Sequence, residues 1–147
     1  MYKKIVLAYD GSSFSMAALH QGANIAKDCK AELHLLSIVE TTGSMAIAEA
    51  VGTEDVWGVE QLHLEEAIRR AVAELRGLVL TVVVCVRDGD PASEIAAYAH
   101  EIDADLVVLG HTERGALSRW LGNSIGSRLL DHLPCSLLVA IESSELC

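Results

Sequence analysis

Five short runs of dense apolar residues alternate in this chain with segments whose apolar residues recur every three or four positions. The runs are Lys3–Tyr9, Ala31–Val39, Leu80–Val86, Leu106–Leu109 and Ser136–Ile141. They do not alternate apolar with polar residues as a half-solvated strand does, so we expect strands covered on both faces. The helical segments are Phe14–Lys27, Val59–Arg76, Pro91–Glu101 and Ser124–His132. We therefore predict one domain, residues 1–147, with a doubly wound α/β fold: a five-stranded parallel sheet with helices on both faces.

The middle of the chain contains a segment without periodicity followed by a segment with helical spacing. Thr41–Gly58 carries Gly43, Gly52 and Gly58 and no sustained apolar period, which is typical of a mobile loop or a short helical excursion. Helical spacing returns from Val59 to Arg76. The residues expected to face inward there are Leu62, Ala67, Ile68, Ala71, Val72 and Leu75.

The charge balance and the cysteines exclude several classes of partner. Eleven Lys and Arg against 21 Asp and Glu give a net charge of −10, which argues against nucleic acid or an anionic membrane. No apolar run approaches the roughly 20 residues of a membrane-spanning helix, so no membrane insertion is expected. The first apolar run stops at Asp10, too short for a signal peptide, and the four cysteines form no CxxC pair. We expect a cytoplasmic protein without a zinc site.

The segment after Leu109 is the best candidate for a ligand site. Doubly wound sheets bind ligands at the carboxyl ends of their strands, and Gly110–Ser127 is the segment richest in small residues. It leads into a helix N-terminus, where free N–H groups and the helix dipole suit phosphate. A plain glycine-rich surface loop with a serine cap fits the same composition. A Walker A loop is excluded, because Ala116-Leu117 stands where that motif requires Lys-Ser/Thr.

Four segments, taken in their order and spacing, resemble the universal stress protein family over nearly the full length of the chain. They are Lys3–Ser12, Ala31–Val39, Gly89–Ile95, and Asp103–His111 with the tail Leu129–Val139. The resemblance implies a Rossmann-like fold of the adenine nucleotide alpha-hydrolase type. It also implies a homodimer formed through the last strand, Ser136–Ile141, with a protein client that the sequence does not name.

One branch of that family binds ATP through a Gly-x2-Gly-x9-Gly-Ser/Thr motif. In this chain the corresponding positions are Gly110, Glu113, Asn123 and Ser124, so the first glycine and the final serine match. Glu113 places a carboxylate where phosphates would lie, and like-charge repulsion there opposes binding. Asn123 is a milder change, because asparagine tolerates left-handed backbone conformations. Gly115 and Gly122 lie near the two missing glycines, so a shifted loop could restore the phosphate site.

The resemblance also assigns a set of nucleotide-binding residues to this chain. They are Ala8, Asp10, Ile38, Leu109, Gly110, His111, Asn123, Ser124 and Ile125. Asp10 is the acidic residue expected to contact the nucleoside, and Ala8, Ile38 and Leu109 are its apolar neighbours. Asp10 also fits a turn-forming role before Gly11-Ser12, and the two roles can coexist.

No set of residues in the sequence forms a convincing catalytic or metal site. The six histidines are scattered, and phosphoanhydride cleavage would need Mg²⁺ with a ligand and a positioned water. We expect a stress-response protein that binds ATP or another adenine nucleotide, with or without Mg²⁺, and does not turn it over efficiently. Two alternatives stay open, a protein-interaction dimer that has lost the nucleotide and a slow ATP hydrolase.

Overall fold

The structure is a computed structural model that describes residues 1–39, 55–78, 81–111 and 129–141. Its strands are β1 (Lys4–Ala8), β2 (Glu32–Val39), β3 (Thr81–Asp88), β4 (Leu106–His111) and β5 (Ser136–Ile141). They form one parallel sheet in the order β3-β2-β1-β4-β5. Its helices are α1 (Ser13–Cys29), α3 (Asp55–Arg76) and α4 (Pro91–Ile102), and residues 129–132 are also helical. The predicted five-stranded parallel α/β fold is confirmed.

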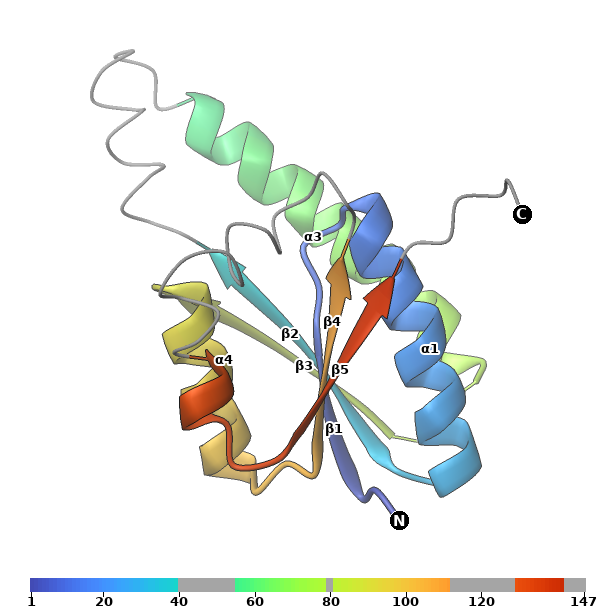
Figure 1. Cartoon of the computed structure of the whole chain (residues 1–147). Helices are drawn as coiled ribbons and strands as arrows, with labels where there is room; N and C mark the ends of the chain where they lie inside the picture. The colour runs from blue at the N-terminus through green and yellow to red at the C-terminus, as the bar shows by residue number, and fades with distance from the viewer. Residues whose placement is uncertain (40–54, 79–80, 112–128, 142–147) are drawn as a thin grey trace.

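The helices form a layer on each face of the sheet (Figure 1). Successive strand residues point to opposite faces, so Ile5 and Leu7 enter the core under α1 and α3, whereas Val6 enters the core under α4. Leu129 packs into the α4 side as well. The middle of the central strand β1 is fully enclosed, since Ile5, Val6 and Leu7 are 0% exposed. The prediction that both faces are covered therefore holds for the centre of the sheet.

Helices α1 and α4 begin and end at residues that satisfy their free backbone groups. Ser12 caps α1 and Asp90 caps α4, each accepting a hydrogen bond from a backbone N–H three residues on. Pro91 occupies the first turn of α4, where its missing N–H costs nothing. Lys30 and Asp103 end the two helices in the left-handed conformation. The turns at the strand–helix junctions are thus specified locally.

Helix α3 differs from the prediction in its start and in one inward residue. It begins at Asp55 and not at Val59, so residues 55–58 of the segment predicted as a mobile loop or a short helical excursion are helical. Residues 41–54 of that segment lie outside the described residues. Leu62, expected inward, is 65% exposed. It lies about 240° around the helix from Ile68, at 100° per residue, whereas Leu64 lies on the Ile68 side and packs against the core.

The edge strand β3 is also less covered than its apolar sequence predicts. Val82, Val84 and Val86 share the face on which α3 lies. Val82 packs against that core, whereas Val84 and Val86 are 43% and 53% exposed. An apolar run therefore indicates burial on both faces only where a helix crosses the strand. No helix in the described part of the chain is long and apolar enough to cross a membrane.

Candidate functional site

A pocket opens at the carboxyl end of the sheet, where the chain order reverses. The chain adds β2 and β3 on one side of β1 and then crosses to β4 on the other, and ligands bind at such a switch point. The pocket has a volume of about 520 Å³, which includes the space at its open side. Its lining residues are Ala8, Tyr9, Asp10, Ser15, Leu36, Ile38, Pro91, Ile95, Leu109 and Gly110. They come from the ends of three strands and the first turns of α1 and α4.

Five of the nine residues predicted to bind nucleotide meet in this pocket. They are Ala8, Asp10, Ile38, Leu109 and Gly110. His111 ends β4, so its backbone lies next to Gly110. Asn123, Ser124 and Ile125 lie outside the described residues, as do Glu113 and the rest of the glycine-rich segment up to residue 128. The structure thus brings together the residues predicted to contact the nucleoside and the first glycine of the predicted phosphate motif.

Asp10 shapes the rim of the pocket through a turn. Its Oδ1 accepts a hydrogen bond from the Ser12 backbone N–H at 2.9 Å and another from the Ser12 hydroxyl. Gly11 between them has φ +86°, a conformation that favours glycine. The turn-forming role predicted for Asp10 is therefore present. The side chain stays exposed at the end of β1, so it is also accessible to a ligand.

The walls of the pocket are apolar and fixed. Leu36, Ile95 and Leu109 are each at most 1% exposed, and Ala8 and Ile38 pack against the same core on the α4 side. Rigid apolar walls beside a few polar groups are typical of small-molecule sites. The pocket can receive a flat aromatic group such as a purine ring against its apolar walls, with polar contacts at its rim.

Buried hydrogen bonds hold the ends of β1 and β2 together beneath the rim. The Tyr9 N–H donates to the Leu36 carbonyl at 2.9 Å, and the Ser37 hydroxyl donates to the Tyr9 carbonyl at 2.7 Å. Burial, and then the nearby Asp10 charge, raises the pKa of Tyr9. The phenol therefore stays protonated at neutral pH and contributes no charge to the site.

Sequence reasoning missed the contributions of α1 and α4. Ser15, Pro91 and Ile95 line the pocket, but none of them is among the nine residues predicted to bind nucleotide. Pro91 directly follows the Asp90 cap, so a helix starting at a strand end was the available signal. Among the described residues no group of three or more His, Cys, Asp or Glu side chains could hold a metal ion.

Comparison with known proteins identifies the family. The family model for the universal stress protein family matches residues 1–140. A universal stress protein of Methanocaldococcus jannaschii is 29% identical over 139 residues, covering 95% of this chain and 82% of that protein. The chain therefore belongs to the universal stress protein family.

Solved structures share the fold at lower sequence identity. A universal stress protein in complex with cAMP is 22% identical and has a TM-score of 0.65, with 97% of this chain and 98% of that chain covered. A universal stress protein from Archaeoglobus fulgidus in complex with dAMP is 18% identical, with a TM-score of 0.66 and coverage of 94% and 97%. These likenesses support the α/β fold over nearly the whole chain.

Proposed function

We propose that this chain binds an adenine nucleotide, ATP or a related one, in the pocket at the carboxyl end of β1, β2 and β4. The observation that carries the proposal is the rigid apolar pocket with Asp10 at its rim. Two structural neighbours, in complex with cAMP and with dAMP, support an adenine nucleotide as the ligand class. The bound nucleotide acts as a signal or stabilises the fold.

In this proposal each part of the ligand has a matching chemical surface. The purine lies against Ile38, Ala8 and Leu109, because burying an aromatic ring beside apolar side chains is favourable. Asp10 accepts a hydrogen bond from a sugar hydroxyl, since a carboxylate is a strong acceptor. The phosphate end lies toward Gly110, the first glycine of the predicted phosphate segment.

The first experiment is mass spectrometry of the purified protein, native and then denatured, to identify any small molecule carried from the cell. Calorimetry with AMP, cAMP and ATP then measures affinity. Asp10→Asn keeps the turn, because asparagine forms the same local hydrogen bonds, but removes the charged acceptor. A hydrogen bond to a charged group contributes about 1.5–3 kcal/mol, so affinity should fall roughly tenfold to hundredfold.

Two further variants separate a site effect from a general one. Asp28→Asn removes an exposed carboxylate on α1, away from the pocket-lining residues, and should leave affinity unchanged. Ile38→Glu would place a carboxylate against the apolar wall and should prevent binding. The proposal fails if the protein releases no nucleotide and none of the three ligands produces heat or a thermal shift.

We also propose that the bound nucleotide is not turned over efficiently. The support is chemical, because phosphoanhydride cleavage needs neutralisation of the phosphate charge and a positioned water, whereas Glu113 at the second motif position would add a negative charge beside the phosphates. Glu113→Gly should strengthen ATP binding by removing a carboxylate near the phosphates. Mg²⁺-dependent phosphate release that disappears in Ser124→Ala would instead indicate a slow hydrolase.

The proposal includes a homodimer formed through β5. Among the described strands β5 pairs only with β4, and no other described strand lies along its outer edge. Its side chains Leu137, Leu138 and Val139 are half-buried, and Ile141 is 61% exposed. An open apolar edge strand favours pairing with another chain. A second copy would pair with this edge and cover Ile141.

A further inference from the structure

The carboxylate of Asp10 uses only one of its two oxygens in contacts with the described residues. Its Oδ1 accepts a hydrogen bond from the Ser12 backbone N–H at 2.9 Å and another from the Ser12 hydroxyl. These two donors occupy both lone pairs of Oδ1. No donor among the described residues is bonded to Oδ2. Asp10 therefore keeps one whole acceptor oxygen for a group that enters the pocket.

Ser12 is itself held in place by the first turn of α1. Its hydroxyl oxygen accepts a hydrogen bond from the Ser15 backbone N–H at 3.4 Å. Its carbonyl accepts one from the Ser15 hydroxyl at 2.7 Å and one from the Met16 N–H at 3.2 Å. Ser15 lines the pocket and is 2% exposed. A residue bonded in this way is a rigid support for the carboxylate that it contacts.

The backbone between Asp10 and Ser12 is fixed by packing as well as by hydrogen bonds. Gly11 has φ +86°, a conformation that favours glycine. A Cβ added to Gly11 would lie 3.1 Å from the Cβ of Ala67 on α3, which is closer than the roughly 3.5–4.0 Å of ordinary carbon contacts. The turn is therefore packed directly against α3. The Ser12 N–H and hydroxyl thus meet Asp10 from a fixed position.

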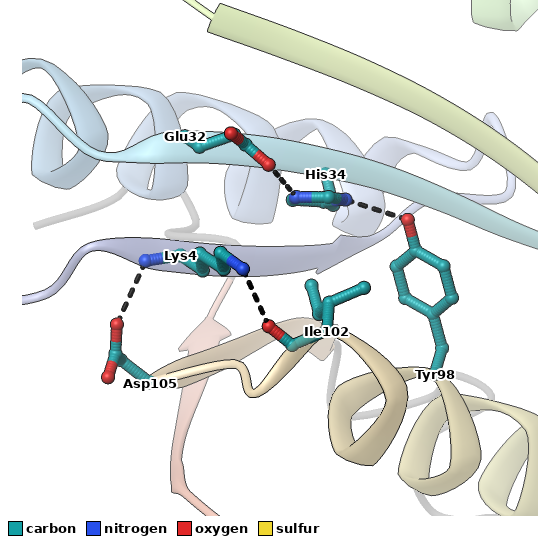
Figure 2. Close-up of polar contacts among 6 residues, drawn as sticks. All are labelled: Lys4, Glu32, His34, Tyr98, Ile102 and Asp105. Carbon is teal, nitrogen blue, oxygen red and sulfur yellow. Dashed lines mark hydrogen bonds and ion pairs between the residues drawn. The ribbon is translucent and has the colours of Figure 1, made fainter.

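The wall of the pocket that α4 contributes is fixed too. Its lining residues are Pro91 and Ile95. The same helix is joined to β2 through Tyr98, whose hydroxyl lies 2.7 Å from Nδ1 of the buried His34. Figure 2 shows the Tyr98 side chain reaching from α4 to the His34 ring. Because the walls are fixed, a purine against Ile38 has one position for its sugar, and the acceptor at the rim has to point toward it.

We propose that Ser12 is a positioning residue of the nucleotide site: its hydroxyl holds Oδ1 of Asp10, so that Oδ2 faces the pocket and accepts a hydrogen bond from a sugar hydroxyl. This role rests on the proposed function, because it needs a nucleotide in the pocket. Asp10 is exposed, and an exposed side chain loses rotamer freedom when a ligand fixes it. Ser12 removes part of that loss by orienting the carboxylate before the ligand arrives.

The size of the effect follows from the ordering of one side chain. Immobilising one side chain on binding weakens affinity by about two- to tenfold. This factor applies only to a ligand with the sugar hydroxyl that Asp10 accepts. A nucleotide without that hydroxyl makes no bond to Oδ2, so its affinity should not depend on the Ser12 hydroxyl. Ser12 should therefore change a ratio of affinities, whereas a loss of fold stability would weaken the binding of every nucleotide alike.

Calorimetry of the intact protein with AMP, 2′-deoxyAMP and 3′-deoxyAMP tests this ratio. The wild-type protein should bind AMP roughly tenfold to hundredfold more tightly than the analogue that lacks the hydroxyl bonded to Asp10, the factor for a hydrogen bond to a charged group. In Ser12→Ala this preference should fall by about two- to tenfold through weaker binding of AMP. Ser12→Thr keeps a hydroxyl at the same position and should keep the preference.

A second variant separates the positioning of Asp10 from the capping of α1, because Ser12 does both. Glycine retains most of the capping stability that alanine loses, yet both variants lack the hydroxyl. Ser12→Gly should therefore lose the preference as Ser12→Ala does, and it remains informative if the alanine variant fails to fold. Three-bond NMR couplings of Asp10 report its rotamers without ligand. They should show one rotamer in the wild-type protein and several in the variants, and one rotamer throughout would overturn the proposal.

The calorimetric outcomes distinguish this proposal from the proposed function. Binding of AMP with a preference that falls in Ser12→Ala and Ser12→Gly supports both. Binding of AMP with an unchanged preference in these variants would overturn the role of Ser12 and leave the nucleotide site standing. Equal binding of all three nucleotides by the wild-type protein would do the same, because no sugar hydroxyl would then reach Asp10. No binding of any of the three would overturn both proposals.

Discussion

Replacing Gly22 with alanine tests how tightly α1 packs on the sheet. Gly22 is buried on α1, and an added Cβ would lie 2.6 Å from Leu7 Cδ1 and 3.7 Å from Val108 Cγ2. Leu7 and Val108 are both 0% exposed. Carbon atoms pack best at about 3.5–4.0 Å, so the Leu7 methyl group would have to move by about 1 Å within a close-packed core.

Two opposing free-energy terms decide the outcome. Alanine is better than glycine in a helix by about 1 kcal/mol, whereas overpacking a core costs about 1–3 kcal/mol. We expect Gly22→Ala to lower the free energy of unfolding by about 1 kcal/mol, because Leu7 has no solvent into which it can move. Urea denaturation monitored by circular dichroism measures this difference.

A double-mutant cycle with Leu7 assigns the cost to this contact. Leu7→Ala alone should destabilise by about 2–5 kcal/mol, but it removes the clashing methyl group. In that background Gly22→Ala should become stabilising by up to about 1 kcal/mol, the helix-propensity term. Gly77→Ala, one residue past the end of α3, is a control for packing alone, since among the described residues its Cβ would meet the Glu74 carbonyl at an ordinary 3.6 Å. Stabilisation by Gly22→Ala in the wild-type background would refute the argument.

Two further predictions concern the start and the edge of the sheet. Asp105 accepts hydrogen bonds from the backbone N–H groups of Lys4 and Lys3, and these bonds lower its pKa. They stabilise the fold fully above the pKa of the unfolded state, about 3.9. This stabilisation is lost as pH falls through the lower pKa of the folded state. Asp105→Asn should cost about 1 kcal/mol at neutral pH, and thermal unfolding should show the deficit vanish in acid, whereas a deficit that persists there would contradict this. Ile141→Asp on β5 should dissociate the proposed dimer in sedimentation velocity through like-charge repulsion. Val86→Asp on the opposite edge should not, and the reverse pattern would place the interface on β3.

The sequence alone determined the order and type of the elements. Dense apolar runs and three-to-four spacing require only neighbours along the chain, so they predicted the five strands and the cores of the helices. The Asp10-Gly11-Ser12 turn was equally accessible, because its hydrogen bonds join residues two apart.

The tertiary structure alone decided which sides of the helices and strands contact one another. Leu62 has an apolar side chain at helical spacing, yet its side of α3 faces solvent because the sheet lies on the Ile68 side. His34 and Tyr98 are 64 positions apart, and no local pattern indicates their hydrogen bond. The pocket likewise joins strand ends to Ser15 of α1 and Ile95 of α4. Periodicity predicts the type of an element and its apolar side, whereas the burial of that side and its contacts depend on how the helices cross the sheet.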